Sequence, residues 1–146
     1  MNEAMEADFQ PLPASMLEHM QSRRALLHAR VAQHFPDHEL SHTAADFDLL
    51  QRIVDAGILA AEDVADWEAM GLAFGDGLTT LVPGLAWAQV TDQYGTDAVL
   101  RYRQTSLQIG VVTMLLKRAE ADEAIDIAHM AQWLQAFIEE KAHEYQ

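Results

Sequence analysis

Residues 84–103, GLAWAQVTDQYGTDAVLRYR, decide the fold because their side chains divide between two faces with a period of two, for example Leu85 and Trp87 against Ala86, Ala88 and Val90. This alternation is typical of β-strands, whose successive side chains point to opposite faces of a sheet. The pattern is interrupted at Asp92-Gln-Tyr-Gly95, a set of residues that favours a turn. The stretch therefore predicts a hairpin, and the alternation over residues 107–111 predicts a third strand that completes an antiparallel meander.

Helical periodicity surrounds this meander. Ser15 and Glu18 form a capping-box pattern, and apolar side chains then recur at helical spacing, which predicts a first helix over residues 15–35. Further helices are expected over residues 43–57, 64–81 and 112–121, and from residue 126 onward. The fold class that follows is α+β, with N-terminal helices, a three-stranded antiparallel meander and C-terminal helices packed on one face of the sheet.

The length of 146 residues and the hydrophobic content of 50% suit one domain. Within it, residues 1–13 are expected to be flexible, residues 14–60 to form a helical extension, and residues 61–146 to form a helix-sheet-helix core. The third predicted helix contains Gly71, Gly75 and Gly77, each of which weakens a helix by up to ~1 kcal/mol relative to alanine. We expect these glycines to mark close packing or a bent helix end.

Composition excludes several classes of function. The chain has no cysteine, which rules out disulfides and thiolate metal sites and indicates a reducing, cytoplasmic location. The longest apolar run, residues 110–116, is far shorter than the ~20 residues that cross a bilayer, so no membrane association is expected. A net charge of −14 disfavours nucleic acid, whose binding requires clustered Lys and Arg. No cofactor is expected.

The acidic residues are unevenly distributed. Between Ile53 and Leu100 there are eight Asp and Glu residues and no Lys or Arg. Such a surface attracts a basic protein partner. The alternative is a solvated face that promotes solubility. The apolar seam of the third helix also permits a homodimer, although the same seam is needed for the core.

Several short motifs occur together in the second half of the chain: Leu72-Ala-Phe-Gly-Asp76, Trp87, Asp92-Gln-Tyr94-Gly95, Arg101-Tyr102, Met114-Leu-Leu-Lys117-Arg118 and Ile125-Asp126. Through these motifs, residues 72–137 resemble the bacterial family catalogued as domain of unknown function 3806. The resemblance implies the same order of sheet and helices, with the N-terminal helices as an extension. It implies no substrate, cofactor or catalytic residue.

The sharpest enzymatic signal is His38-Glu-Leu-Ser-His42, which has the H-E-x-x-H spacing of zinc hydrolases. On a helix this spacing places two imidazoles on one face, beside a carboxylate that activates zinc-bound water. However, Pro36 lies two residues before His38, and the local pattern favours a connector between the first two helices. His38 and His42 are therefore candidate metal ligands, and a polar connector is the alternative.

A second group consists of basic residues. Arg101, Arg103, Lys117 and Arg118 are four of the nine basic residues and fall within eighteen positions. Arg101 and Arg103 lie on one strand face, where their guanidinium groups can hold a carboxylate or a phosphate. In the alternative interpretation they pair with nearby acidic side chains and cover the sheet with their stems.

Asp76, Asp92 and Tyr94 are the polar residues that we expect to join such a site, because they lie at the ends of predicted elements. Asp92 also has an ordinary role in the predicted turn. The candidate binding residues are thus Asp76, Asp92, Tyr94, Arg101, Arg103 and Arg118.

Taken together, the sequence favours a non-enzymatic protein-binding module, of immunity or regulatory type, that engages a basic partner through an acidic surface. Two alternatives stay open. One is a zinc-dependent hydrolase that uses His38 and His42. The other is a protein that binds a small anionic ligand near Arg101.

Overall fold

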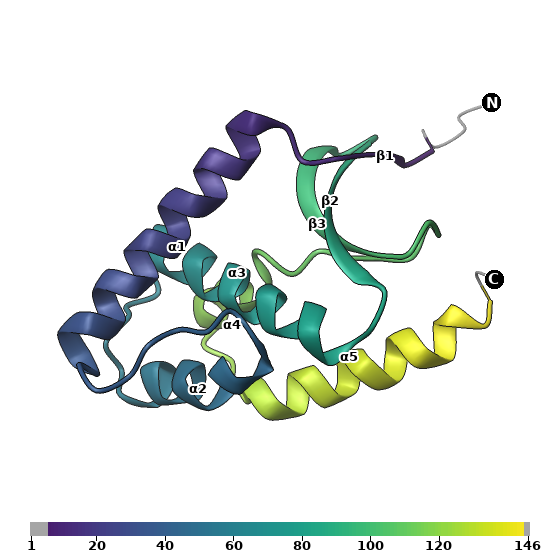
Figure 1. The fold of residues 1–146 in the computed structure, drawn as a ribbon. Coiled ribbons are helices and arrows are strands. Elements are labelled where there is room, and N and C mark those ends of the chain that lie inside the picture. Colours follow the sequence, from purple (N-terminus) through teal and green to yellow (C-terminus); the bar gives the residue numbers. More distant parts are fainter. Residues whose placement is uncertain (1–5, 145–146) are drawn as a thin grey trace.

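The computed structural model describes residues 6–144 and has an α+β architecture, as the sequence predicts (Figure 1). Its elements, in chain order, are β1 (Asp8–Gln10), α1 (Ala14–His34), the short 3₁₀ helix η1 (Ala44–Asp46), α2 (Phe47–Asp55), α3 (Val64–Leu81), β2 (Leu85–Asp92), β3 (Gly95–Tyr102), β4 (Gln108–Ile109), α4 (Met114–Glu120) and α5 (Ile127–Ala142). No helix among these described residues is long and apolar enough to cross a membrane.

The sheet has the strand order β1-β2-β3-β4, and every neighbouring pair is antiparallel. The predicted hairpin is confirmed, because Leu85 pairs with Tyr102 and the register continues to Asp92 opposite Gly95. The predicted strand count of three was one too few. The fourth strand, β1, is too short to carry an alternation signal and is defined only by its pairing, with Phe9 opposite Val90. The sequence predicts a flexible segment over residues 1–13, of which residues 1–5 lie outside the described part.

Helix α3 lies at the centre of the molecule and contacts α1, α2, α4, α5 and β2 (Figure 1). Its predicted bounds are confirmed, but the prediction of one apolar seam was incomplete. Eleven of the twelve residues from Leu78 back to Trp67 are buried, so the helix is enclosed on all sides. A helix surrounded in this way requires small residues wherever a neighbour approaches its backbone.

The three glycines of α3 provide these approaches, which confirms the expectation of close packing. A methyl group on Gly71 would overlap the backbone carbonyl of Val112. On Gly75 it would overlap the indole of Trp87, and on Gly77 the ring of Phe47. The sheet, the segment before α4 and the start of α2 therefore each contact α3 at a different glycine.

Charge complementarity joins α1 to α3. Arg30 of α1 donates to both carboxylate oxygens of Asp66, at 2.9 and 3.3 Å. These hydrogen bonds, together with the negative charge of Asp66, raise the pKa of Arg30 above its ordinary value. Arg23 lies 3.9 Å from Glu68, too far for a hydrogen bond. Part of the acidic stretch is thus neutralised inside the molecule by the arginines of α1.

The helix ends agree with the sequence in one case and differ in another. Asp126 caps α5 by accepting a hydrogen bond from the backbone of His129, at the predicted position. The capping box predicted at Ser15 was wrong, because α1 begins one residue earlier and its first turn has no side-chain cap. The carbonyl of Pro13 accepts the backbone hydrogen bonds of Met16 and Leu17 instead. Proline fixes the extended backbone that precedes the helix, so no side-chain cap is needed for the chain to enter it.

Candidate functional site: a cleft between the first helix and the sheet

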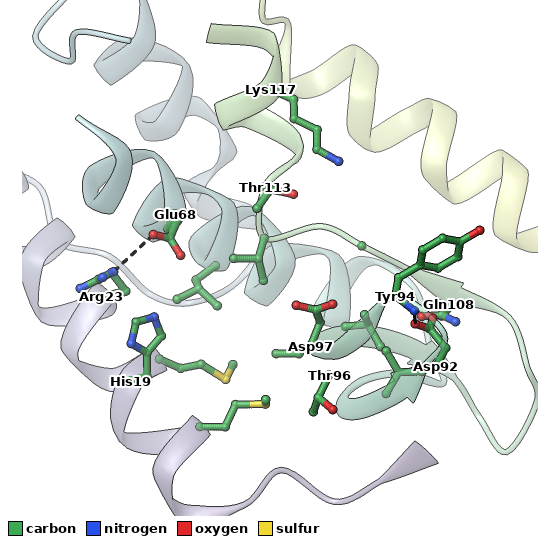
Figure 2. Close-up of a pocket in the computed structure, with 18 residues that line it drawn as sticks. His19, Arg23, Glu68, Asp92, Tyr94, Thr96, Asp97, Gln108, Thr113 and Lys117 are labelled. Atoms are coloured by element: carbon green, nitrogen blue, oxygen red, sulfur yellow. Dashed lines mark hydrogen bonds and ion pairs between the residues drawn. The ribbon is translucent and has the colours of Figure 1, made fainter. Parts of the chain in front are cut away.

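A cleft of about 450 Å³ opens between α1, α3, the β2–β3 hairpin and the segment that leads into α4 (Figure 2). Its walls come from parts of the chain that are distant in sequence. Clefts of a few hundred cubic ångströms with an apolar floor and a few polar groups are typical of ligand sites.

The floor of the cleft is apolar. Met20, Leu72, Val90 and Val99 line it, and none of these side chains is more than 4% exposed. All four lie outside the main hydrophobic cluster, which is formed by the helices and the other end of the sheet. They therefore form a second apolar cluster, with α1 and α3 on one side and the hairpin on the other.

The rim of the cleft carries three carboxylates, Glu68, Asp92 and Asp97, and two cations, Arg23 and Lys117 (Figure 2). The nearest cation to Glu68 is Arg23, at 3.9 Å. Among residues 6–144, no Lys, Arg or His nitrogen lies within 4 Å of Asp92 or Asp97. The rim thus holds more negative than positive charge, and Asp92 and Asp97 lack a cationic partner among the described residues.

Two of the predicted binding residues, Asp92 and Tyr94, belong to this cleft. Asp92 ends β2 and accepts a hydrogen bond from the backbone of Tyr94 at 2.9 Å, which fixes the turn. The side chain of Tyr94 is 85% exposed and stands at the rim of the cleft (Figure 2). A large exposed aromatic ring beside an apolar floor is suited to contact with a partner.

Asp76 lies in the interior rather than in the cleft, and it connects three other elements. Arg24 of α1 donates to both of its oxygens, at 2.8 and 2.9 Å. The indole nitrogen of Trp87 in β2 donates to one oxygen at 3.0 Å, and Nδ1 of His42 lies 3.1 Å from the other. With its side chain 9% exposed, Asp76 is a buried carboxylate whose charge and hydrogen bonds are satisfied by this network.

The network ends in a pair of histidines. Nε2 of His42 lies 2.9 Å from Nε2 of His28, so one ring donates and the other accepts. His42 has a φ of 61° and is held there by Asp46, whose carboxylate accepts hydrogen bonds from the backbone of Ser41 and of His42. In a serine hydrolase, the histidine of an Asp–His pair uses its second nitrogen to contact the hydroxyl of the nucleophilic serine. In the Asp76–His42 pair, that nitrogen, Nε2 of His42, contacts the imidazole of His28 instead.

His38, the other candidate metal ligand, lies apart from His42. Its Nε2 is 3.0 Å from a guanidinium nitrogen of Arg52, and residues 38–42 form a connector without helical structure. The H-E-x-x-H spacing therefore does not bring its two imidazoles onto one helical face. Within residues 6–144, no three His, Asp or Glu side chains converge in a way that could hold a metal ion.

The remaining predicted residues lie at two further places. Arg101 and Arg103 line a separate hollow of about 270 Å³ beside β1, β2 and the end of β3. Arg118, near the end of α4, donates to the carbonyl of Ala124 and lies 3.8 Å from Glu123. The structure thus distributes the predicted binding set over four places rather than one.

Comparison with known proteins identifies the family. The model of the family described as domain of unknown function (DUF3806) matches residues 46–130. The chain belongs to this family. No curated protein matches the chain.

A solved structure extends the similarity beyond the DUF3806 segment. A crystal structure of a protein from Bacteroides thetaiotaomicron VPI-5482 matches with a TM-score of 0.76 and 21% identity over 89% of this chain. The chain spans about half the length of that protein, 47%. At this identity the similarity shows the fold alone.

The DUF3806 segment provides only part of each site. Strands β2–β4, α3 and α4 lie within residues 46–130, whereas β1 and α1 precede them. Met20 and Arg23 of the cleft come from α1, as does Arg24 of the Asp76 network. The cleft is therefore the seam between the family segment and the N-terminal helix.

Sequence reasoning missed the residues that α1 contributes. Arg23, Arg24 and Arg30 were not singled out, although α1 holds three of the nine basic residues of the chain. The available signal was complementarity, because a helix with three arginines precedes a helix that contains Asp66, Glu68 and Asp76. Opposite charges on two amphipathic helices favour their packing against each other.

Proposed function

We propose that this DUF3806 protein is a non-enzymatic binding module that recognises a basic segment of a partner protein in the cleft between α1 and the sheet. The observation that carries the proposal is the combination of an apolar floor with a rim of three carboxylates, two of which, Asp92 and Asp97, have no Lys, Arg or His nitrogen within 4 Å among residues 6–144. A cytoplasmic location belongs to the same proposal, and a chain without cysteine is compatible with a reducing compartment.

The contrast between carboxylates of the same region supports this assignment. Asp66 and Asp76 each receive two hydrogen bonds from one arginine, and both are buried. They serve the packing of α1 on α3. Asp92 and Asp97 lie on the hairpin and pair with no arginine of residues 6–144; Asp92 accepts only the backbone hydrogen bond of Tyr94. Carboxylates whose charge is not paired within the described residues are available to a cationic ligand.

The ligand chemistry follows from the two parts of the cleft. A Lys or Arg side chain near Asp92 and Asp97 gains charge-assisted hydrogen bonds, and a neighbouring apolar side chain covers Val90 and Val99. Lys117 gives the cleft a positive end, so a bound segment has a preferred direction. The net charge of −14 attracts a basic partner over longer distances, in a manner that salt weakens. An immunity or regulatory protein that neutralises a basic partner has these properties.

A pull-down with the full chain tests the proposal. A D92N/D97N variant removes two charges from the cleft, and asparagine preserves the acceptor that fixes the turn at Tyr94. An E139Q/E140Q variant removes two charges from exposed positions on α5 and serves as the matched control. Each protein is incubated with extract of its own organism at 50 and 300 mM NaCl, and bound proteins are joined by a carbodiimide, which links carboxylates directly to lysines.

The proposal predicts a basic partner that is retained at 50 mM NaCl and lost at 300 mM. It also predicts cross-links at Glu68, Asp92 or Asp97, and capture by the control variant but not by D92N/D97N. Equal capture by both variants, or cross-links confined to other carboxylates, would contradict it.

A further inference from the structure

The basic residues of this chain divide into two groups according to their partners. Six of the nine lie within 4 Å of a carboxylate: Arg23, Arg24, Arg30, Arg52, Arg118 and Lys141. Among residues 6–144, Arg101, Arg103 and Lys117 have no such partner. This overturns the interpretation in which Arg101 and Arg103 pair with acidic residues of the same region. In a chain with 23 acidic residues, two arginines that face one hollow without a carboxylate partner need another explanation.

We infer that Arg101 and Arg103 form a binding site for a small oxyanion, the carboxylate or phosphate group of a small molecule, in the hollow between β1, β2 and the end of β3. The hollow has a volume of about 270 Å³ and is separate from the cleft, with which it shares no lining residue. It therefore extends the function beyond recognition of a basic partner.

Arg101 is held in place by its own surroundings. Its Nε donates to the carbonyl of Thr105 at 2.7 Å, and its guanidinium carbon lies 4.0 Å from the centre of the Phe9 ring. Strand β2 lies between β1, which carries Phe9, and β3, which carries Arg101. Ala86 and Ala88 of β2 have short side chains, so the Phe9 ring and the Arg101 guanidinium can meet above them. Both terminal amino groups of Arg101 lack partners within residues 6–144, and neither is buried. They present the planar fork that binds oxyanions with two hydrogen bonds.

Arg103 adds the second cation from an unusual backbone conformation. It follows β3 with a φ of 50°, a value that side chains other than glycine rarely adopt, and its backbone N–H donates to the carbonyl of Gly84 at 2.7 Å. A Cβ on Gly84 would lie 2.9 Å from Cγ of Arg103, so the glycine makes room for the arginine stem. The guanidinium carbon lies 5.2 Å from the Tyr102 ring centre. Backbone strain that is maintained by its surroundings is often associated with binding sites.

The rest of the lining fits an anionic group on a small molecule. Phe9 and Pro11 supply apolar surface, and Gln104 supplies an amide. The nearby Asp8 is engaged by Gln10, whose amide nitrogen lies 3.3 Å from its carboxylate. Two guanidinium groups therefore face the hollow. Pre-organised cations of this kind lower the entropy lost when an anion binds.

NMR titration of the full-length ¹⁵N-labelled protein tests this site. The two probes are sodium phosphate and sodium acetate, added separately at constant ionic strength maintained with chloride. At least one probe is expected to cause saturable shifts of the Nε–H signals of Arg101 and Arg103 and of the Gly84 amide. Saturation with phosphate alone assigns a phosphate group, and saturation with acetate alone assigns a carboxylate. No saturable shift with either probe overturns the inference.

Variants separate the site from general charge effects. Arg103→Gln is expected to weaken binding about tenfold, because a charge-assisted hydrogen-bonding partner is lost. Arg103→Lys keeps the charge and the stem but not the fork, and a loss of at least about threefold is expected. The Arg103→Lys variant also tests the site if Arg103→Gln fails to fold. Lys141→Gln removes one positive charge on α5 and is expected to leave affinity within about twofold. Equal weakening by Lys141→Gln and the Arg103 variants would refute a specific site.

Discussion

Replacement of Asp76 by asparagine is the perturbation from which the structure predicts the clearest loss of stability. Asp76 accepts two hydrogen bonds from Arg24 and one from Trp87, and it lies beside His42. Asparagine has nearly the same shape, but its amide nitrogen replaces one carboxylate oxygen. That nitrogen is a donor, so it cannot accept the hydrogen bond that the oxygen accepts from Arg24. The substitution also leaves the charge of Arg24, 15% exposed, without its counterion.

The magnitude follows from these contacts. Removal of one partner from a buried ion pair costs roughly 3–5 kcal/mol, since the other charge stays buried without compensation. Asp76→Asn keeps one acceptor oxygen and the Arg24 side chain keeps some contact with solvent, so we expect a loss of about 3 kcal/mol. In a chain of this length, that loss corresponds to a fall in Tm of roughly 6–12 °C.

Urea unfolding followed by circular dichroism measures this loss. Asp48→Asn is the matched control, because the Asp48 side chain is 89% exposed and lies 3.9 Å from Arg52. An exposed pair of this kind contributes at most about 0.5 kcal/mol. In an Arg24→Met/Asp76→Asn double variant, the loss should be smaller than the sum of the two single losses. A loss for Asp76→Asn no larger than that for Asp48→Asn would refute the role of the network.

Two further predictions concern packing. Gly71→Ala should lower the free energy of unfolding by about 3 kcal/mol, because the added methyl group would overlap the backbone of Val112. Gly110→Ala should change it by less than about 0.5 kcal/mol, because a Cβ added at Gly110 would meet no atom within 4 Å. Urea denaturation compares the two variants, and equal losses would contradict the packing around α3. Trp133 is 59% exposed, whereas Trp67 is only 4% exposed. Trp133→Phe should therefore remove most of the tryptophan fluorescence that acrylamide quenches. Unchanged quenching would show that another indole is the exposed one.

Much of the fold follows from patterns that lie within single elements. The alternation over residues 84–103 predicts the hairpin and the place of its turn, and helical spacing predicts the bounds of α3. Strand β1 was missed because three residues carry no period, and only pairing with β2 makes them a strand. The enclosure of α3 was also missed, because periodicity shows which side chains are apolar but not how many neighbours approach a glycine.

The site was less predictable, because it depends on contacts between distant parts of the chain. Asp76 was predicted to join a binding site near Arg101, but it lies in an interior network whose other members, Arg24, Trp87 and His42, are 52, 11 and 34 positions away in the sequence. The H-E-x-x-H spacing made His38 and His42 candidate metal ligands, and the structure agrees with the alternative of a connector. The meaning of the spacing depends on a helix, and Asp46 holds that segment as a connector through its bonds to Ser41 and His42.

The central claim, that the cleft recognises basic segments, is tested most directly by titration of the ¹⁵N-labelled protein with two tripeptides. One is acetyl-Lys-Leu-Arg-amide and the other is acetyl-Glu-Leu-Glu-amide, which has the same length and central residue. We predict that the basic peptide shifts the backbone signals of the cleft residues Leu72, Val99 and Gly110, more strongly at 50 than at 300 mM NaCl, and that the acidic peptide does not. Equal shifts with both peptides, or shifts that fall outside the cleft, would contradict the account.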